Sequence, residues 1–214
     1  MLTLHFKVLY IMNKYENDLT HIRQMMERSS TFISLSGLSG VGAGLVALAG
    51  CFLTFFILGK HQIDYFDGKP NYYSFQVILQ LATVALGTLI LALMSGIYFT
   101  VKKSKKLGHP VWSAATRNTV KAAIIPLVTG GLFCIILTWH QLFYMVAPSM
   151  LIFYGLALVN ASKFTQSDIY QLGMCQLVLG LLAAVFVGYG LVFWGIGFGV
   201  LHIIYGIWMY HRYK

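Results

Sequence analysis

Residues 74–101 read SFQVILQLATVALGTLILALMSGIYFTV, and the next five residues read KKSKK. No charged side chain interrupts the longer stretch. About twenty residues of α-helix, rising ~1.5 Å each, cross a hydrocarbon core that is about 30 Å thick. The stretch therefore predicts a membrane-spanning helix that ends in a positively charged interface.

Five further apolar stretches of spanning length accompany the first. They are 32–58, 120–139, 142–159, 169–189 and 191–210, and all six acidic residues fall in the gaps or at the edges of these stretches. With 58% hydrophobic and only 10% charged residues, the composition lies outside the range of soluble proteins. The sequence predicts an all-α, polytopic membrane protein with six transmembrane helices.

The positive charges predict the orientation of these helices. Cationic segments resist translocation, so Lys and Arg collect in cytoplasmic loops. Of the 15 Lys and Arg residues, only Lys60 and Lys69 fall on one side of the predicted membrane. We therefore expect both termini in the cytoplasm, together with the loops 102–118 and 161–168.

The connections between spans divide the chain. The third and fourth spans, and the fifth and sixth, are joined by about three residues each, so each pair is expected to form a short antiparallel hairpin.

We expect a cytoplasmic segment at 1–30 with an amphipathic helix at 15–30, a six-helix domain at 31–210 and a basic tail at 211–214. The segment 1–11 reads as an upstream extension of a chain that starts at Met12, and it lacks the features of a signal peptide.

Several function classes find no support in the sequence. The net charge of +9 flanks apolar runs, which favours contact with anionic headgroups over nucleic acid. Cys51, Cys134 and Cys175 lie singly inside apolar runs and form no metal-binding spacing. Because no recognised catalytic or phosphate-binding motif is present, we expect no enzymatic activity, no cofactor, no catalytic residue and no metal site.

Small residues predict where helices pack closely. Ser36, Gly40 and Gly44 recur every four residues in the first span, and Gly195 and Gly199 lie in the sixth. Such rows allow a neighbouring backbone to approach. The neighbour can be another helix of the same chain, which is the simpler interpretation, or the first span of a second copy in a homodimer.

Polar residues within the spans define a candidate pocket. Ionisable groups at membrane depth tend to face the interior of a bundle, and His202 is the histidine that lies well inside a span. Interhelical hydrogen bonds of about 0.6 kcal/mol each are the structural alternative. A haem or metal site shared with His140 is not expected, because the two histidines lie at different depths. The candidate pocket comprises His202, Gln76, Gln80, Asn160 and Gln176.

Parts of the chain resemble a family of small, uncharacterised bacterial multi-pass membrane proteins. The resemblance rests on IRQMMERSSTFISLSGLSG at 22–40, YGLALVNASK at 154–163, GYGL at 188–191 and HIIYG at 202–206. It implies a location in the bacterial inner membrane, and it implies no activity.

Two hypotheses for function follow. The first is a non-enzymatic accessory, scaffold or sensory membrane subunit that contacts a partner through its basic cytoplasmic face and the 15–30 helix. The second is a small-molecule or lipid transporter or channel with a polar path near His202. A redox protein that binds a cofactor through His202 ranks below both.

Overall fold

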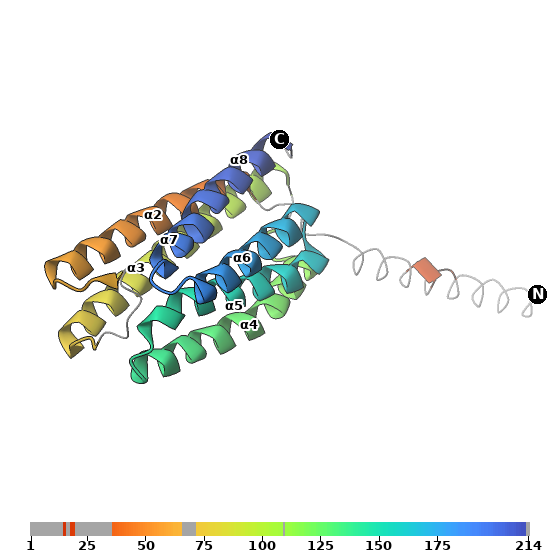
Figure 1. The fold of residues 1–214 in the computed structure, drawn as a ribbon. Coiled ribbons are helices and arrows are strands. Elements are labelled where there is room, and N and C mark those ends of the chain that lie inside the picture. The colour runs from red at the N-terminus through yellow and green to blue at the C-terminus, as the bar shows by residue number, and fades with distance from the viewer. Residues whose placement is uncertain (1–14, 16–17, 20–35, 66–71, 109, 213–214) are drawn as a thin grey trace, which may run out of the picture.

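Six helices that are long and apolar enough to cross a membrane form the protein in the computed structural model (Figure 1). The structure describes residues 15, 18–19, 36–65, 72–108 and 110–212. It is all-helical over these residues, which confirms the predicted fold class. The predicted 15–30 helix and the segment 1–11 lie almost entirely outside the described residues.

The first five spans are each built on one α-helix, and the sixth is divided. The helices are α2 (Gly37–Lys60), α3 (Phe75–Lys106), α4 (Ala114–Trp139), α5 (Val146–Ala161) and α6 (Ser167–Val185). Short 3₁₀ turns, η2 (Phe143–Met145) and η3 (Ser162–Phe164), flank α5. The last span consists of α7 (Gly190–Trp194), the π-helical segment η4 (Gly195–Leu201) and α8 (His202–Arg212).

Two helices extend well past their apolar stretches. α3 continues through the KKSKK segment, and its 32 residues correspond to a length of about 48 Å. α4 begins at Ala114, six residues before the apolar run, because the side chain of Ser113 caps it by accepting a hydrogen bond from Thr116 N at 3.1 Å. The helices end where their caps lie, and not where the hydrocarbon ends.

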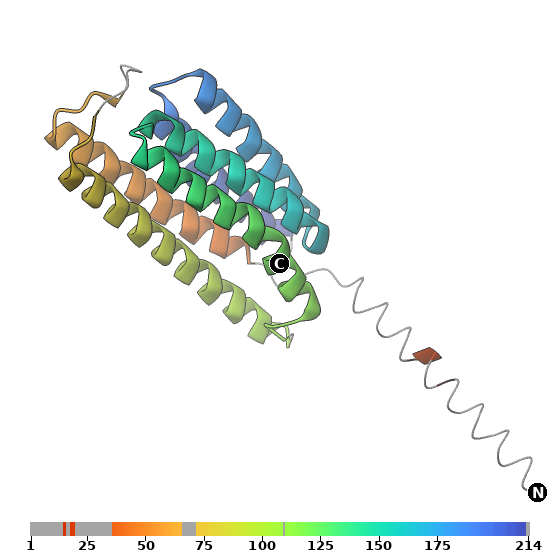
Figure 2. The same cartoon turned by 90° about the horizontal axis from the view of Figure 1, so that it is seen from below.

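The helices form two groups that the last span connects. α2 packs between α3 and the last span, whereas α5 packs between α4 and α6 (Figures 1 and 2). α7 contacts α5 and α6, and α8 contacts chiefly α2. The last span therefore crosses from one group to the other, and its π-helical segment η4 lies at the crossing.

Glycine brings α2 and the last span into close contact. A methyl group at Gly44 would lie 2.7 Å from Gly199 O, and one at Gly40 would lie 3.0 Å from His202 O. A methyl group at Gly206 would lie 2.6 Å from both Gly37 O and Val41 N. Since these are backbone atoms, no side-chain rotation could relieve such contacts, and both helices need glycine here.

A second glycine contact joins α5 to α6. A methyl group at Gly155 would lie 2.9 Å from Gly173 O, and one at Gly173 would lie 3.0 Å from Gly155 O. The outer faces of α3 and α4 are open by comparison, because a methyl group at Gly87, Gly96 or Gly131 would meet no atom within 4 Å. Each group is thus tightly packed at its centre.

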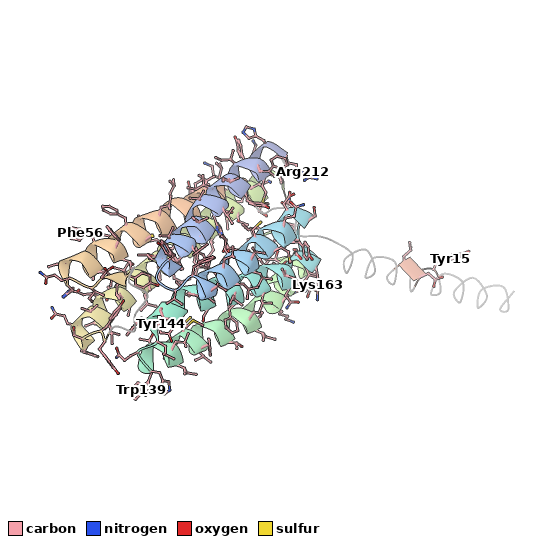
Figure 3. The ribbon with its side chains drawn as sticks, in the orientation of Figure 1. Tyr15, Phe56, Trp139, Tyr144, Lys163 and Arg212 are labelled. Atoms are coloured by element: carbon pink, nitrogen blue, oxygen red, sulfur yellow. The ribbon has the colours of Figure 1, made fainter. Side chains whose placement is uncertain are left out.

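The two ends of the bundle differ in charge. We call the end that carries the cations of the 102–121 segment, Lys163 and Arg212 the basic end. Figure 3 shows Lys163 and Arg212 at this end, and Phe56, Trp139 and Tyr144 toward the opposite one. Gly37 and Tyr210 meet at the basic end, so α2 starts where α8 ends.

An apolar cluster closes the opposite end. Leu58, Tyr73 and Val77 are buried there, and Tyr73 stacks on Phe143 with ring centroids 4.1 Å apart. The Tyr73 backbone N–H donates to Gln141 Oε1 at 3.1 Å, which ties the loop after α2 to the turn between α4 and α5. Burial, with smaller contributions from Tyr73 and Cys51, raises the pKa of the nearby Tyr65 above its usual value.

Candidate functional site

The polar centre of the bundle is His202, the first residue of α8. Its side chain is 7% exposed and reaches from the last span toward α5. His202 Nδ1 lies 2.9 Å from Gly197 O, and His202 Nε2 lies 2.8 Å from the hydroxyl of Tyr154 on α5. Both ring nitrogens are therefore engaged by groups of this chain.

These two contacts determine the tautomer of His202. A carbonyl oxygen only accepts hydrogen bonds, so Nδ1 must carry the hydrogen. In the neutral ring Nε2 is then the acceptor, and the Tyr154 hydroxyl donates to it. A metal ion or haem iron would need a free nitrogen lone pair, and Tyr154 occupies the only one.

Gln176 on α6 joins the same centre. Its side chain is fully buried, and Nε2 donates to Gly197 O at 2.8 Å. The carbonyl of Gly197 thus accepts from two side chains, on α6 and α8. Gln176 Oε1 is buried without a hydrogen-bond partner, and it would lie 2.6 Å from a methyl group at Gly197. Gly197 therefore leaves just enough room for the Gln176 amide.

Aromatic rings cover the histidine. The Phe198 ring is nearly parallel to that of His202, with centroids 6.0 Å apart, and it also contacts Tyr154 at 4.9 Å. Trp194 packs on Phe198 from one turn earlier, at 5.0 Å. The side of the centre that faces away from the basic end is accordingly apolar.

Polar contacts continue from this centre to the basic end along α6 and α8. Cys175 Sγ lies 3.8 Å from the Tyr205 hydroxyl, and Arg212 donates to Asp168 Oδ1 at 2.9 Å. Asp168 and Cys175 are seven residues apart on α6, as are Tyr205 and Arg212 on α8, so each helix presents one face to the other. We call these contacts, together with the His202 centre, the polar seam.

Asp168 is the buried charge of the seam. It is the second residue of α6 and its side chain is 1% exposed, whereas that of Arg212 is 51% exposed. Asp168 Oδ2 is buried without a hydrogen-bond partner. The sequence placed Asp168 at the edge of a span, because it precedes the apolar run by one residue. The structure places it inside the first helical turn and under cover of the neighbouring helices.

The five residues of the candidate pocket do not form one site. His202 and Gln176 meet at Gly197 O. Gln76 is exposed on α3, and Gln80 contacts His61 Nε2 through Oε1 at 3.0 Å near the opposite end. Asn160 donates to Ala122 O at 2.7 Å and so links α5 to α4. Gln76 and Gln80 lie apart from the His202 centre because they belong to α3, and Asn160 lies apart because it reaches from α5 to α4.

The predicted packing residues lie mainly between α2 and the last span. Gly40, Gly44 and Gly199 form this contact, and a methyl group at Gly195 would lie 3.1 Å from Cys51 Sγ. Ser36 is buried just before α2 and accepts a hydrogen bond from Ser39 N at 3.0 Å. The glycine face of the first span thus packs against the last span of the same chain.

Sequence reasoning missed Tyr154, Gly197 and the pairing of Asp168 with Arg212. Tyr154 was visible only as a tyrosine in the middle of an apolar span, and Gly197 as one of several glycines. Among the described residues, no group of three or more His, Cys, Asp or Glu side chains could hold a metal ion.

Comparisons with known proteins add no relative. No family model matches the chain, and neither a curated protein nor a solved structure matches it significantly.

Proposed function

We propose that this protein is a non-enzymatic accessory or sensory subunit of a bacterial inner membrane, which acts through its basic end. The observation that supports this most directly is the closure of the His202 centre. Both nitrogens of His202 bond to Tyr154 and Gly197, and Gln176 is fully buried. A path for a substrate needs polar groups that are free to bind it, whereas both nitrogens of His202 and the amide nitrogen of Gln176 already bind groups of this chain.

The basic end offers the contact surface in this proposal. Its cations lie around the α3–α4 connection, in the α5–α6 connection and at the end of α8, and those with exposed side chains are Lys102, Lys105, Lys106, Arg117, Lys121, Lys163 and Arg212. Such a surface attracts anionic headgroups and acidic segments of other proteins. By the distribution of Lys and Arg, this is the cytoplasmic face.

A photo-crosslinking amino acid placed at single positions in living cells tests the proposal. Trp112, 63% exposed, and the exposed Lys163 are the test positions at the basic end, and Trp139, 83% exposed, is the matched position at the opposite end. We expect a discrete protein adduct from the first two and none from Trp139. Arg117→Glu should abolish the adduct if charge draws the partner. Adducts to lipid alone from both basic-end positions would refute the proposal.

A transporter is the second candidate, and the buried Asp168 favours it. A carboxylate that is 1% exposed at the mouth of a polar seam is a feature of ion and proton pathways. Purified protein in liposomes should then carry protons or a solute down a gradient, and Asp168→Asn should stop it. Absence of flux for the wild type, with an intact fold, would leave the first candidate alone.

A further inference from the structure

The junction between the two helix groups differs from the contacts within each group. α2 and α8 touch through glycine, as do α5 and α6, whereas the backbones of α6 and α8 approach at few positions. Over the half of the bundle nearest the basic end, long polar side chains bridge α8 to α5 and α6. At this junction polar side chains, and not glycine contacts between backbones, join α8 to α5 and α6.

We propose that His202 is a proton-binding site whose occupancy changes how the two helix groups are joined at the basic end. The proposal goes beyond the proposed function, since it concerns the bundle itself and requires no partner. If the protein is a sensory subunit, the proton is the signal that it reads.

The geometry allows a proton to be added without breaking a covalent bond. In the neutral state Nδ1–H donates to Gly197 O, and Tyr154 O–H donates to Nε2. On acidification a hydronium ion transfers its proton to the Nε2 lone pair, which forms an N–H bond and leaves a neutral water molecule. The Tyr154 hydroxyl must then rotate, so that its oxygen accepts from Nε2–H. The Tyr154–His202 hydrogen bond thereby reverses its direction.

The groups around His202 decide what the added charge does. Gly197 O faces the ring from η4 and Tyr154 from α5, while α6 brings Gln176 to the same carbonyl and α2 presents Gly40 to the His202 backbone. All of these are neutral. The charged residues of the seam, Asp168 and Arg212, lie at its basic end, ten residues from His202 along α8.

The positive charge of an imidazolium at this position is consequently poorly compensated by its neutral neighbours. Neutral acceptors replace only part of the hydration that a cation has in water, so the charged state favours any arrangement that admits water. Side chains make the printed contacts between α6 and α8, through Cys175 with Tyr205 and Asp168 with Arg212, so we expect water to enter there. We expect such entry to move the basic end of α8, which continues from the π-helical segment η4. Glycines at 195, 197 and 199 give η4 the freedom to bend.

Nuclear magnetic resonance of the ¹⁵N-histidine-labelled protein in nanodiscs tests the proton site. His202→Gln identifies the signal, and His140, exposed in the turn after α4, serves as the reference. At pH 8 we expect His202 to carry hydrogen on Nδ1 alone, and on acidification, as long as the fold persists, on both nitrogens. An Nε2–H tautomer at pH 8, or no titration before the fold is lost, would overturn the proposal.

A distance measurement at the basic end tests whether protonation of His202 changes how the two helix groups are joined. Spin labels on non-canonical amino acids at Lys105 and Lys163 report the separation of the two groups at the basic end and leave the native cysteines in place. We expect this distance to change by about 2 Å, the scale of helix shifts in switching proteins, over the pH range in which His202 titrates. The change should be absent from His202→Gln and retained in His140→Gln.

If His202→Gln fails to fold, measurements on the wild-type protein alone test the proposal. The ¹⁵N signals of His202 and the distance between the two spin labels must then change over the same pH range. Titration of His202 with a constant distance would overturn the proposal. Loss of the crosslinks from Trp112 and Lys163 would refute the proposed function and leave the proton site intact, so the two failures are distinguishable.

Discussion

Replacing Gly206 by alanine should weaken the contact between α2 and α8. The added methyl group would lie 2.6 Å from Gly37 O and from Val41 N, compared with at least 3.4 Å in an ordinary contact. The two backbones must therefore separate by about 0.8 Å at this point. Because the atoms belong to the backbone of α2, no rotamer change can absorb the clash.

The expected change in the free energy of unfolding is the difference between two opposing contributions. Overpacking of a tightly packed contact costs about 1–3 kcal/mol. Alanine in place of glycine in a helix recovers up to about 1 kcal/mol through its higher helix propensity. Taking the middle of the first range, about 2 kcal/mol, and the full second contribution, we expect Gly206→Ala to lower the free energy of unfolding by about 1 kcal/mol.

The chain offers a matched control for this substitution. Gly96 in α3, like Gly206, is followed by isoleucine and an aromatic residue, and a methyl group there meets no atom within 4 Å. Gly96→Ala should leave stability unchanged or raise it. The assay is reversible unfolding in mixed micelles with increasing sodium dodecyl sulfate. Equal midpoints for the two variants would refute the assigned contact between α2 and α8.

Three further predictions concern the charges and the loop after α2. Arg212→Met should destabilise the protein more than Asp168→Asn, because the loss of Arg212 leaves the buried Asp168 carboxylate without its cation. The unfolding midpoints of the two variants test this order. The raised pKa of Tyr65 means that this side chain keeps its proton in the folded state at a pH where the unfolded chain ionises. Stability should therefore fall as pH rises above 10.0, and Tyr65→Phe should reduce this loss. In intact cells, an impermeant maleimide should label Lys60→Cys and should spare Arg117→Cys until the membrane is opened; the reverse pattern would invert the orientation.

The seam and the glycine contacts were only partly predictable. The first span's glycine row and the glycines of the sixth were recognised as packing positions, and the structure shows that they pack chiefly against each other. His202 and Gln176 were placed in one candidate pocket, and they do meet at Gly197. Gln76, Gln80 and Asn160 were grouped with them as polar residues in or near the spans. Polarity reveals neither which helices are neighbours nor which face of a helix a residue occupies.

By itself, the sequence determined the number of spans, the helical fold class and the short hairpins, because backbone groups in hydrocarbon must bond within a helix and a helix needs about twenty residues to cross. Only the tertiary structure decided which helices touch and that Tyr154 meets His202. The reason is that lipid is as apolar as the interior of the bundle, so hydrophobic periodicity does not mark the packed face. Close backbone approach and buried hydrogen bonds select that face, and both depend on residues far apart in the chain.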